Sequence, residues 1–174
     1  APLVTAKSVS EVGKTWASPT PAAGLSSTLV VSDMDVSAST PHVVKDIDVT
    51  TNIASTYSGD ATITLTHTPP TGAAKTVTLV SPEPCQRTWD HVDDLWLGRA
   101  FDDQADQTAM AFRTDPNGPG LGAVAPQAKL AAFNGMDPPG TWTLTVKDAR
   151  DRYGAPTPAD GVNPADPGVA DDGP

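Results

Sequence analysis

Three segments of the chain alternate apolar residues with threonine at a period of two. They are residues 61–68 (ATITLTHT), 75–81 (KTVTLVS) and 140–148 (GTWTLTVKD). Because successive side chains of a β-strand point to opposite faces, this period predicts strands with one buried face and one solvent-facing face. Threonine suits the solvent-facing side. Strands of this one-sided kind are typical of antiparallel sheets, so we expect an all-β chain.

The segment 46–53 (DIDVTTNI) repeats the alternation and adds charge to it. Its apolar face would carry Ile47, Val49, Thr51 and Ile53, and its polar face would carry Asp46, Asp48, Thr50 and Asn52. Further strands are expected at 27–32 and around 100–101, and single helical turns at 103–112 and 126–133. The 14 Gly and 18 Pro residues favour short elements joined by turns. Together these signals predict one domain built as an antiparallel β-sandwich.

The charge balance indicates which classes of binding partner to expect. The 174 residues carry 11 Lys and Arg against 21 Asp and Glu, a formal net charge of -10. We therefore expect no nucleic-acid partner, because such binding depends on basic side chains. No apolar run approaches the roughly 20 residues that span a bilayer, so no membrane partner is expected either. No signal peptide is visible, and the chain begins at Ala1 without Met, as a processed form or an excised fragment would.

No set of residues has the spacing of a catalytic centre. His42, His67 and His91 are far apart, with no G-x-S-x-G segment and no zinc-ligand spacing, and we expect them at surface or loop positions. Only two Glu residues are present, and no aromatic-rich groove is apparent for carboxylate catalysis of glycoside hydrolysis. Cys85, the single cysteine, is expected to be an idle thiol. The sequence therefore predicts no catalytic residue.

Paired aspartates are the better candidates for a functional site. Calcium prefers six to eight oxygen ligands in flexible geometry, which carboxylates and loop carbonyls can supply. The candidate ligands are three pairs: Asp102 with Asp103, Asp46 with Asp48, and Asp33 with Asp35. Two carboxylates on one strand face repel each other unless a cation lies between them or water screens them. The alternative for each pair is a solvated acidic sheet face.

Several motifs together resemble the P domain, also called the Homo B domain. These are the D-x-D-V strand at 46–49, the T-Y-x-G-D turn at 56–60, the F-D-D segment at 101–103 and the F-N-G-x-D-x-x-G-x-W-x-L segment at 133–144. P domains follow the catalytic domain in kexin- and furin-like proprotein convertases and in bacterial secreted peptidases. The similarity covers about residues 24–148, and we expect the domain at 24–160, after an N-terminal segment (1–23) and before a Pro/Gly/Asp-rich tail (161–174).

The resemblance implies a jelly-roll-like β-sandwich without a reactive centre of its own. It implies a secreted bacterial protein in which the domain supports the folding and stability of a subtilisin-like serine peptidase or related hydrolase. The partner would be the catalytic domain of the same polypeptide, the domain would be monomeric, and Ca²⁺ would be its cofactor.

The chain departs from the family pattern in two places. The G-T-L-x-x-W-x-L strand expected near the carboxyl end is not found after residue 148, and the segment 82–97 is longer than expected. Two other functions stay open: a free-standing binding module for carbohydrate or a protein surface, and a self-contained hydrolase.

Overall fold

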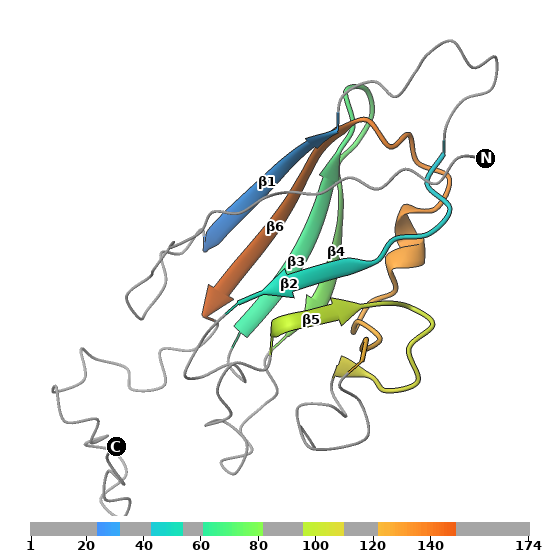
Figure 1. Ribbon diagram of the computed structural model, residues 1–174. Helices are drawn as coiled ribbons and strands as arrows, with labels where there is room; N and C mark the ends of the chain where they lie inside the picture. The colour runs from blue at the N-terminus through green and yellow to red at the C-terminus, as the bar shows by residue number, and fades with distance from the viewer. Residues whose placement is uncertain (1–23, 32–42, 54–60, 82–95, 110–121, 149–174) are drawn as a thin grey trace, which may run out of the picture.

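The computed structural model describes residues 24–31, 43–53, 61–81, 96–109 and 122–148 (Figure 1). Six strands and one short 3₁₀ helix form the described part of the chain. They are β1 (Leu25–Val31), β2 (Val49–Asn52), β3 (Ala61–Thr68), β4 (Lys75–Val80), β5 (Leu97–Phe101), η2 (Leu130–Phe133) and β6 (Gly140–Asp148). No helix among these residues is long and apolar enough to cross a membrane.

Four of the strands form one antiparallel sheet in the order β1-β6-β3-β4. In Figure 1, β6 and β3 run side by side at its centre, although 71 residues separate the end of β3 from the start of β6. Ile63 pairs with Val146 and Leu65 with Leu144, so apolar residues face the same side across the sheet. The alternation predicted for these strands is confirmed by the buried Ile63 and Leu65.

Hydroxyl side chains form rows across the opposite face of this sheet. The pairing aligns one row of Ser26, Thr145, Thr64 and Thr78, and a second row of Thr28, Thr143, Thr66 and Thr76. Neighbours in these rows bond directly at two places. The hydroxyls of Ser26 and Thr145 lie 3.0 Å apart, and those of Thr66 and Thr76 lie 2.8 Å apart. These bonds connect the strands of each pair through uncharged groups.

β2 and β5 form a second, two-stranded antiparallel sheet. Thr51 is buried at its centre, and its hydroxyl donates to the carbonyl oxygens of Trp96 at 3.0 Å and Arg99 at 3.3 Å. The expected strand over 46–53 is thus shorter than the alternation suggested. It pairs only from Val49 to Asn52, where a register shift interrupts the ladder.

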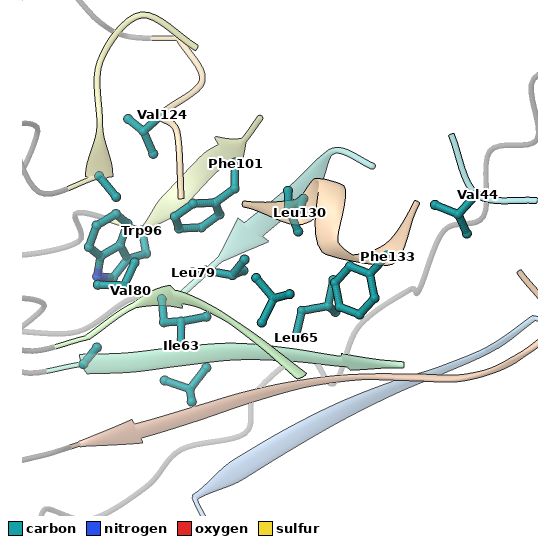
Figure 2. Close-up of a cluster of buried hydrophobic side chains, with 14 residues drawn as sticks. Val44, Ile63, Leu65, Leu79, Val80, Trp96, Phe101, Val124, Leu130 and Phe133 are labelled. Carbon is teal, nitrogen blue, oxygen red and sulfur yellow. The ribbon is translucent and has the colours of Figure 1, made fainter. Parts of the chain in front are cut away.

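One apolar core receives side chains from both sheets and from η2 (Figure 2). Its largest fully buried members include Trp96, Phe101 and Phe133, and Trp96 stacks on Phe101 with ring centroids 5.6 Å apart. Figure 2 shows Phe101 and Phe133 on the same side of the four-stranded sheet as Leu65. The prediction of an all-β fold with antiparallel sheets is confirmed. Its jelly-roll form needs more strands than those described and stays a prediction.

One aromatic position differs from expectation. His67 was expected at the surface or in a loop, but it lies on the inward face of β3 and is fully buried. The reason is its place in the alternation of β3, where every second residue from Ala61 faces the core. Trp96, just before β5, is also a fully buried member of the common core.

Several sequence predictions lie outside the described residues. Among them are the Asp33–Asp35 pair, Cys85, His42, His91, and the N-terminal segment and tail.

Candidate functional site

The candidate site is the end of the two-stranded sheet where β2 begins and β5 finishes. Val49 pairs with Phe101 as the last aligned pair of the ladder. One position beyond this pair, Asp48 precedes β2 and Asp102 follows β5, so the register brings the two acids opposite each other. Asp46 precedes Asp48 by two residues. Asp46 and Asp48 are exposed, and Asp102 is half-buried.

The charges of these three acids influence one another. Partial burial raises the pKa of the Asp48 carboxyl above its ordinary value, and the negative charges of Asp102 and Asp46 raise it further. A raised carboxyl pKa means that the ionised form of Asp48 is disfavoured in this environment. A nearby cation would relieve this, because an opposite charge favours the carboxylate.

Asp102 also organises the chain that leaves β5. Its Oδ1 accepts a 2.7 Å hydrogen bond from the backbone N–H of Gln104, the pattern of an Asx turn. Its own N–H donates to the Val124 carbonyl at 3.0 Å, and its carbonyl accepts from Ala105 N–H at 3.1 Å. Asp102 is therefore held in place by three backbone contacts while it faces the start of β2.

Asp103 has a different role from its neighbour. Its Oδ1 accepts from the backbone N–H of Leu130 and its Oδ2 from that of Ala131, both at 2.8 Å. These N–H groups belong to the first turn of η2, whose donors have no partner within the helix. The carboxylate thus caps a helix from a distant loop, as Lys129 at the N-cap position provides no side-chain bond. The structure gives Asp103 a structural role that the sequence analysis did not foresee.

The donor chemistry of the acid pair suits Ca²⁺, but the group is small. Asp48 and Asp102 offer hard carboxylate oxygens of the kind that calcium binds. Within the described residues, no three His, Cys, Asp or Glu side chains are gathered closely enough to hold a metal ion. An ion at this end of the sheet would need backbone carbonyls and water to fill its remaining positions. The Asp33–Asp35 pair lies outside the described residues, so its predicted part in such a site stays a prediction.

A backbone exchange connects the approach to β2 with the turn after η2. Val44 N–H donates to the Met136 carbonyl at 2.9 Å, and Gly135 N–H donates to the Val44 carbonyl at 2.8 Å. Gly135 has φ +83, a conformation that glycine adopts readily in turns. The segment that bears Asp46 and Asp48 is thereby attached to the segment that Asp103 caps.

The carboxyl end of that turn is held by two stacked rings. His67 stacks on Trp142 with ring centroids 4.0 Å apart and an interplanar angle of 11°. The Nε2 of His67 donates to the Asp137 carbonyl at 2.8 Å, and the Nε1 of Trp142 donates to the Pro138 carbonyl at 3.0 Å. Trp142 packs against the core, with its ring centroid 5.2 Å from that of Phe133.

Sequence reasoning missed the contacts of Asp103 and His67 because each joins residues far apart in the chain. The signal for Asp103 was the adjacent pair Asp102–Asp103 after an apolar strand, but only the fold shows that the two carboxylates diverge to different partners. The signal for His67 was its position in the alternation of β3. No protein-family model, curated protein or solved structure matches this chain, so its function is argued from the residues and contacts described above.

Proposed function

We propose that this chain is a calcium-binding, non-catalytic accessory domain of the P-domain type in a secreted serine peptidase or related hydrolase. It would support the folding and stability of a catalytic domain in the same polypeptide.

The observation that carries this proposal is the mutual contact of the motif segments. The F-D-D segment caps the helix at the start of the F-N-G segment through Asp103, and its Phe101 pairs with Val49 of the D-x-D-V segment. Gly135 of the F-N-G segment bonds to Val44, just before that D-x-D-V segment. Motifs that are separated in sequence thus form one connected unit, which supports reading them as a single family pattern rather than as chance matches.

The calcium part of the proposal concerns the acid pair at the sheet end. Asp48 and Asp102 supply the carboxylates, and Asp46 adds negative charge beside them. Binding of an ion to the folded state alone stabilises it by RT ln(1 + [Ca]/Kd), about 2.7 kcal/mol at a hundredfold excess over Kd. Millimolar extracellular calcium makes even a weak site of this kind effective.

The melting temperature, measured with 5–10 mM Ca²⁺ and again with a chelator, tests the metal claim. This calcium concentration is about a hundredfold excess over a submillimolar Kd. We expect a higher Tm with calcium in the wild type, and a much smaller shift in Asp48→Asn and Asp102→Asn. Asparagine at 102 keeps the oxygen that accepts from Gln104, so the turn is preserved. Asp106→Asn is the matched control, because Asp106 is exposed and lies in the same loop. Equal shifts in all four proteins, or none in the wild type, would contradict the claim.

The accessory role has a separate test. The reading frame should encode a hydrolase domain joined to this chain, and that domain should be expressed with and without it. We expect the soluble yield of active hydrolase to fall severalfold without the chain. A hydrolase that folds equally well alone would reject the role in folding. Binding of the isolated chain to a glycan array would favour the carbohydrate-binding alternative instead.

A further inference from the structure

The sequence contains two Asn-Gly pairs, Asn117–Gly118 and Asn134–Gly135, and the second lies within the described residues. Asn134 is exposed to solvent in the turn that follows η2. Asparagine before glycine is especially prone to lose ammonia, because glycine has no Cβ to hinder the attack of its nitrogen on the asparagine side chain. Asn134 is therefore a candidate site of covalent modification, separate from the acids at the end of the two-stranded sheet.

The reaction consists of ring closure followed by hydrolysis. The Gly135 nitrogen gives its proton to solvent and attacks the side-chain carbonyl carbon of Asn134, and the side-chain nitrogen takes a proton and leaves as ammonia. Water then opens the resulting succinimide at either of its two carbonyls. Opening at the side-chain carbonyl leaves aspartate, whereas opening at the main-chain carbonyl leaves isoaspartate, whose main chain runs through the former side chain. Either route consumes one water and releases one ammonia.

The folded turn keeps the attacking nitrogen engaged in a hydrogen bond. The N–H of Gly135 donates to the Val44 carbonyl at 2.8 Å, and the N–H of Asn134 donates to the Ala131 carbonyl at 3.0 Å. Ring closure replaces the N–H of Gly135 with a bond to carbon, so its hydrogen bond to Val44 has to break first. Val44 is a buried residue, and a carbonyl that loses its donor there costs free energy.

The backbone conformation also keeps the reacting atoms apart. Asn134 has φ -60 and ψ 136, which is an extended conformation. Closure of a five-membered ring requires rotation about the Cα–C bond of Asn134 until the Gly135 nitrogen eclipses Cβ, far from the observed ψ. The same rotation would move Gly135 away from Val44. The folded geometry is therefore not a near-attack arrangement, and the hydrogen bond stabilises it.

We propose that Asn134–Gly135 is a deamidation site that the fold gates, so that ammonia is lost only when the turn separates from Val44. Native proteins open locally at free energies well below that of global unfolding, and an exposed turn is a place where such opening occurs. The rate of modification in the folded protein is then the open-chain rate multiplied by the fraction of molecules in which the turn is open.

The isoaspartate product would keep the turn from closing again. Its main chain is one carbon longer between residues 134 and 135, which shifts the Gly135 N–H relative to the Val44 carbonyl. The adjacent bond, from the Val44 N–H to the Met136 carbonyl at 2.9 Å, depends on the same alignment. The aspartate product keeps the original chain length and can form both bonds again. The two products carry the same charge, so a difference between them reports on chain length alone.

Peptide mapping by mass spectrometry tests the gate. It compares the deamidation rate of Asn134 in the folded chain with the rate in the same chain unfolded in urea. We expect the folded rate to be at least tenfold lower, which corresponds to an opening free energy of about 1.4 kcal/mol. Asn117–Gly118 reports the rate of a second open-chain Asn-Gly pair in the urea sample. Equal rates at Asn134 in the folded and unfolded chains would overturn the proposal.

Hydrogen exchange of the Gly135 amide measures the same opening independently. Both reactions require the bond to Val44 to break. We therefore expect the protection factor of this amide to agree within severalfold with the ratio of the unfolded to the folded deamidation rate at Asn134. Both quantities should fall together as urea is added below the unfolding transition. Deamidation at the open-chain rate while the Gly135 amide stays protected would reject the gate.

The isoaspartate form, separated by chromatography from aged protein, tests the consequence for the turn. Asn134→Asp is the matched control, because it carries the same charge on a main chain of ordinary length. We expect rapid exchange of the Val44 and Gly135 amides in the isoaspartate form and wild-type protection in Asn134→Asp. Equal protection of these amides in the two proteins would contradict the claim that the longer main chain keeps the turn open.

Discussion

Asp103 Oδ1 lies 2.8 Å from the backbone nitrogen of Leu130, 27 residues further along the chain. A carboxylate at the first turn of a helix satisfies donors that the helix cannot, and it interacts favourably with the positive end of the helix dipole. This one contact attaches the loop after β5 to the helix that buries Leu130 and Phe133 in the core.

Replacing Asp103 with alanine should therefore lower the free energy of unfolding by about 1–3 kcal/mol, since two backbone donors lose a charged acceptor. Asp103→Asn should lose less, because its amide oxygen can still accept one bond. Urea unfolding measures both. The control is Asp106→Ala in the same loop, and equal midpoints for the alanine variants at 103 and 106 would contradict the capping role.

Thr51→Val should destabilise the two-stranded sheet, although the two side chains have nearly the same volume. The hydroxyl of Thr51 donates to the carbonyls of Trp96 and Arg99, and valine would remove both bonds, although the Trp96 carbonyl still accepts from the N–H of Ile53 at 3.2 Å. The expected loss is about 1–3 kcal/mol in the free energy of unfolding. Thr50→Val on the exposed face is the matched control and should stay within about 0.5 kcal/mol of the wild type. Similar losses at the two positions would show that the hydroxyl bonds of Thr51 contribute nothing.

Gly140→Ala should be among the more damaging small substitutions in the described chain. Gly140 has φ +127, and an added Cβ would collide with the Thr68 carbonyl oxygen and come within 2.8 Å of the Pro69 Cα. Backbone strain and overlap together should cost about 2–5 kcal/mol. Gly98→Ala is the control, because its φ is +64 but nothing lies within 4 Å of the new Cβ. It should cost about 1 kcal/mol, and a cost at 140 no greater than this would rule out the collision.

Asp48→Asn should stabilise the metal-free protein slightly at pH 7. The pKa of Asp48 is raised in the fold by partial burial and by the charges of Asp102 and Asp46, so its ionised form opposes folding above that pKa. The penalty should disappear as the pH falls into the ordinary carboxyl range, where the side chain is protonated in both states. Because Asp48 is exposed and screened, we expect only a few tenths of a kcal/mol.

Urea unfolding at pH 7 and at pH 3, without guanidinium salt, measures this effect of Asp48→Asn. Asp106→Asn should show no comparable gain at pH 7. In saturating calcium the order should reverse, with the wild type more stable than Asp48→Asn. A gain that is the same at both pH values would mean that charge is not its cause.

Residues 61–68 and 140–148 show how far sequence periodicity reaches. Their alternation predicted the two central strands and the burial of Ile63 and Leu65, because period two is a local property of a strand. The same local pattern could not show that Ile63 pairs with Val146, since the register depends on contacts between segments 71 residues apart.

The candidate site was predictable in its residue types but not in its pairing. The sequence grouped Asp102 with Asp103 and Asp46 with Asp48 because they are neighbours in the chain. The fold instead places Asp48 opposite Asp102, through the pairing of Val49 with Phe101, and turns Asp103 toward η2. Local spacing identifies acids that can share a face, whereas the strand register decides which of them meet.

The hydroxyl rows on the four-stranded sheet give the two halves of the fold different responses to ionic strength. Ser26 with Thr145 and Thr66 with Thr76 hold neighbouring strands together through neutral groups, which dissolved salt does not screen. At the end of the two-stranded sheet, the charges of Asp102 and Asp46 add to the effect of partial burial on Asp48, and salt does screen this charge repulsion. A high salt concentration should therefore slow the hydrogen exchange of the β2 amides, while it leaves the exchange rates of the β3 amides unchanged.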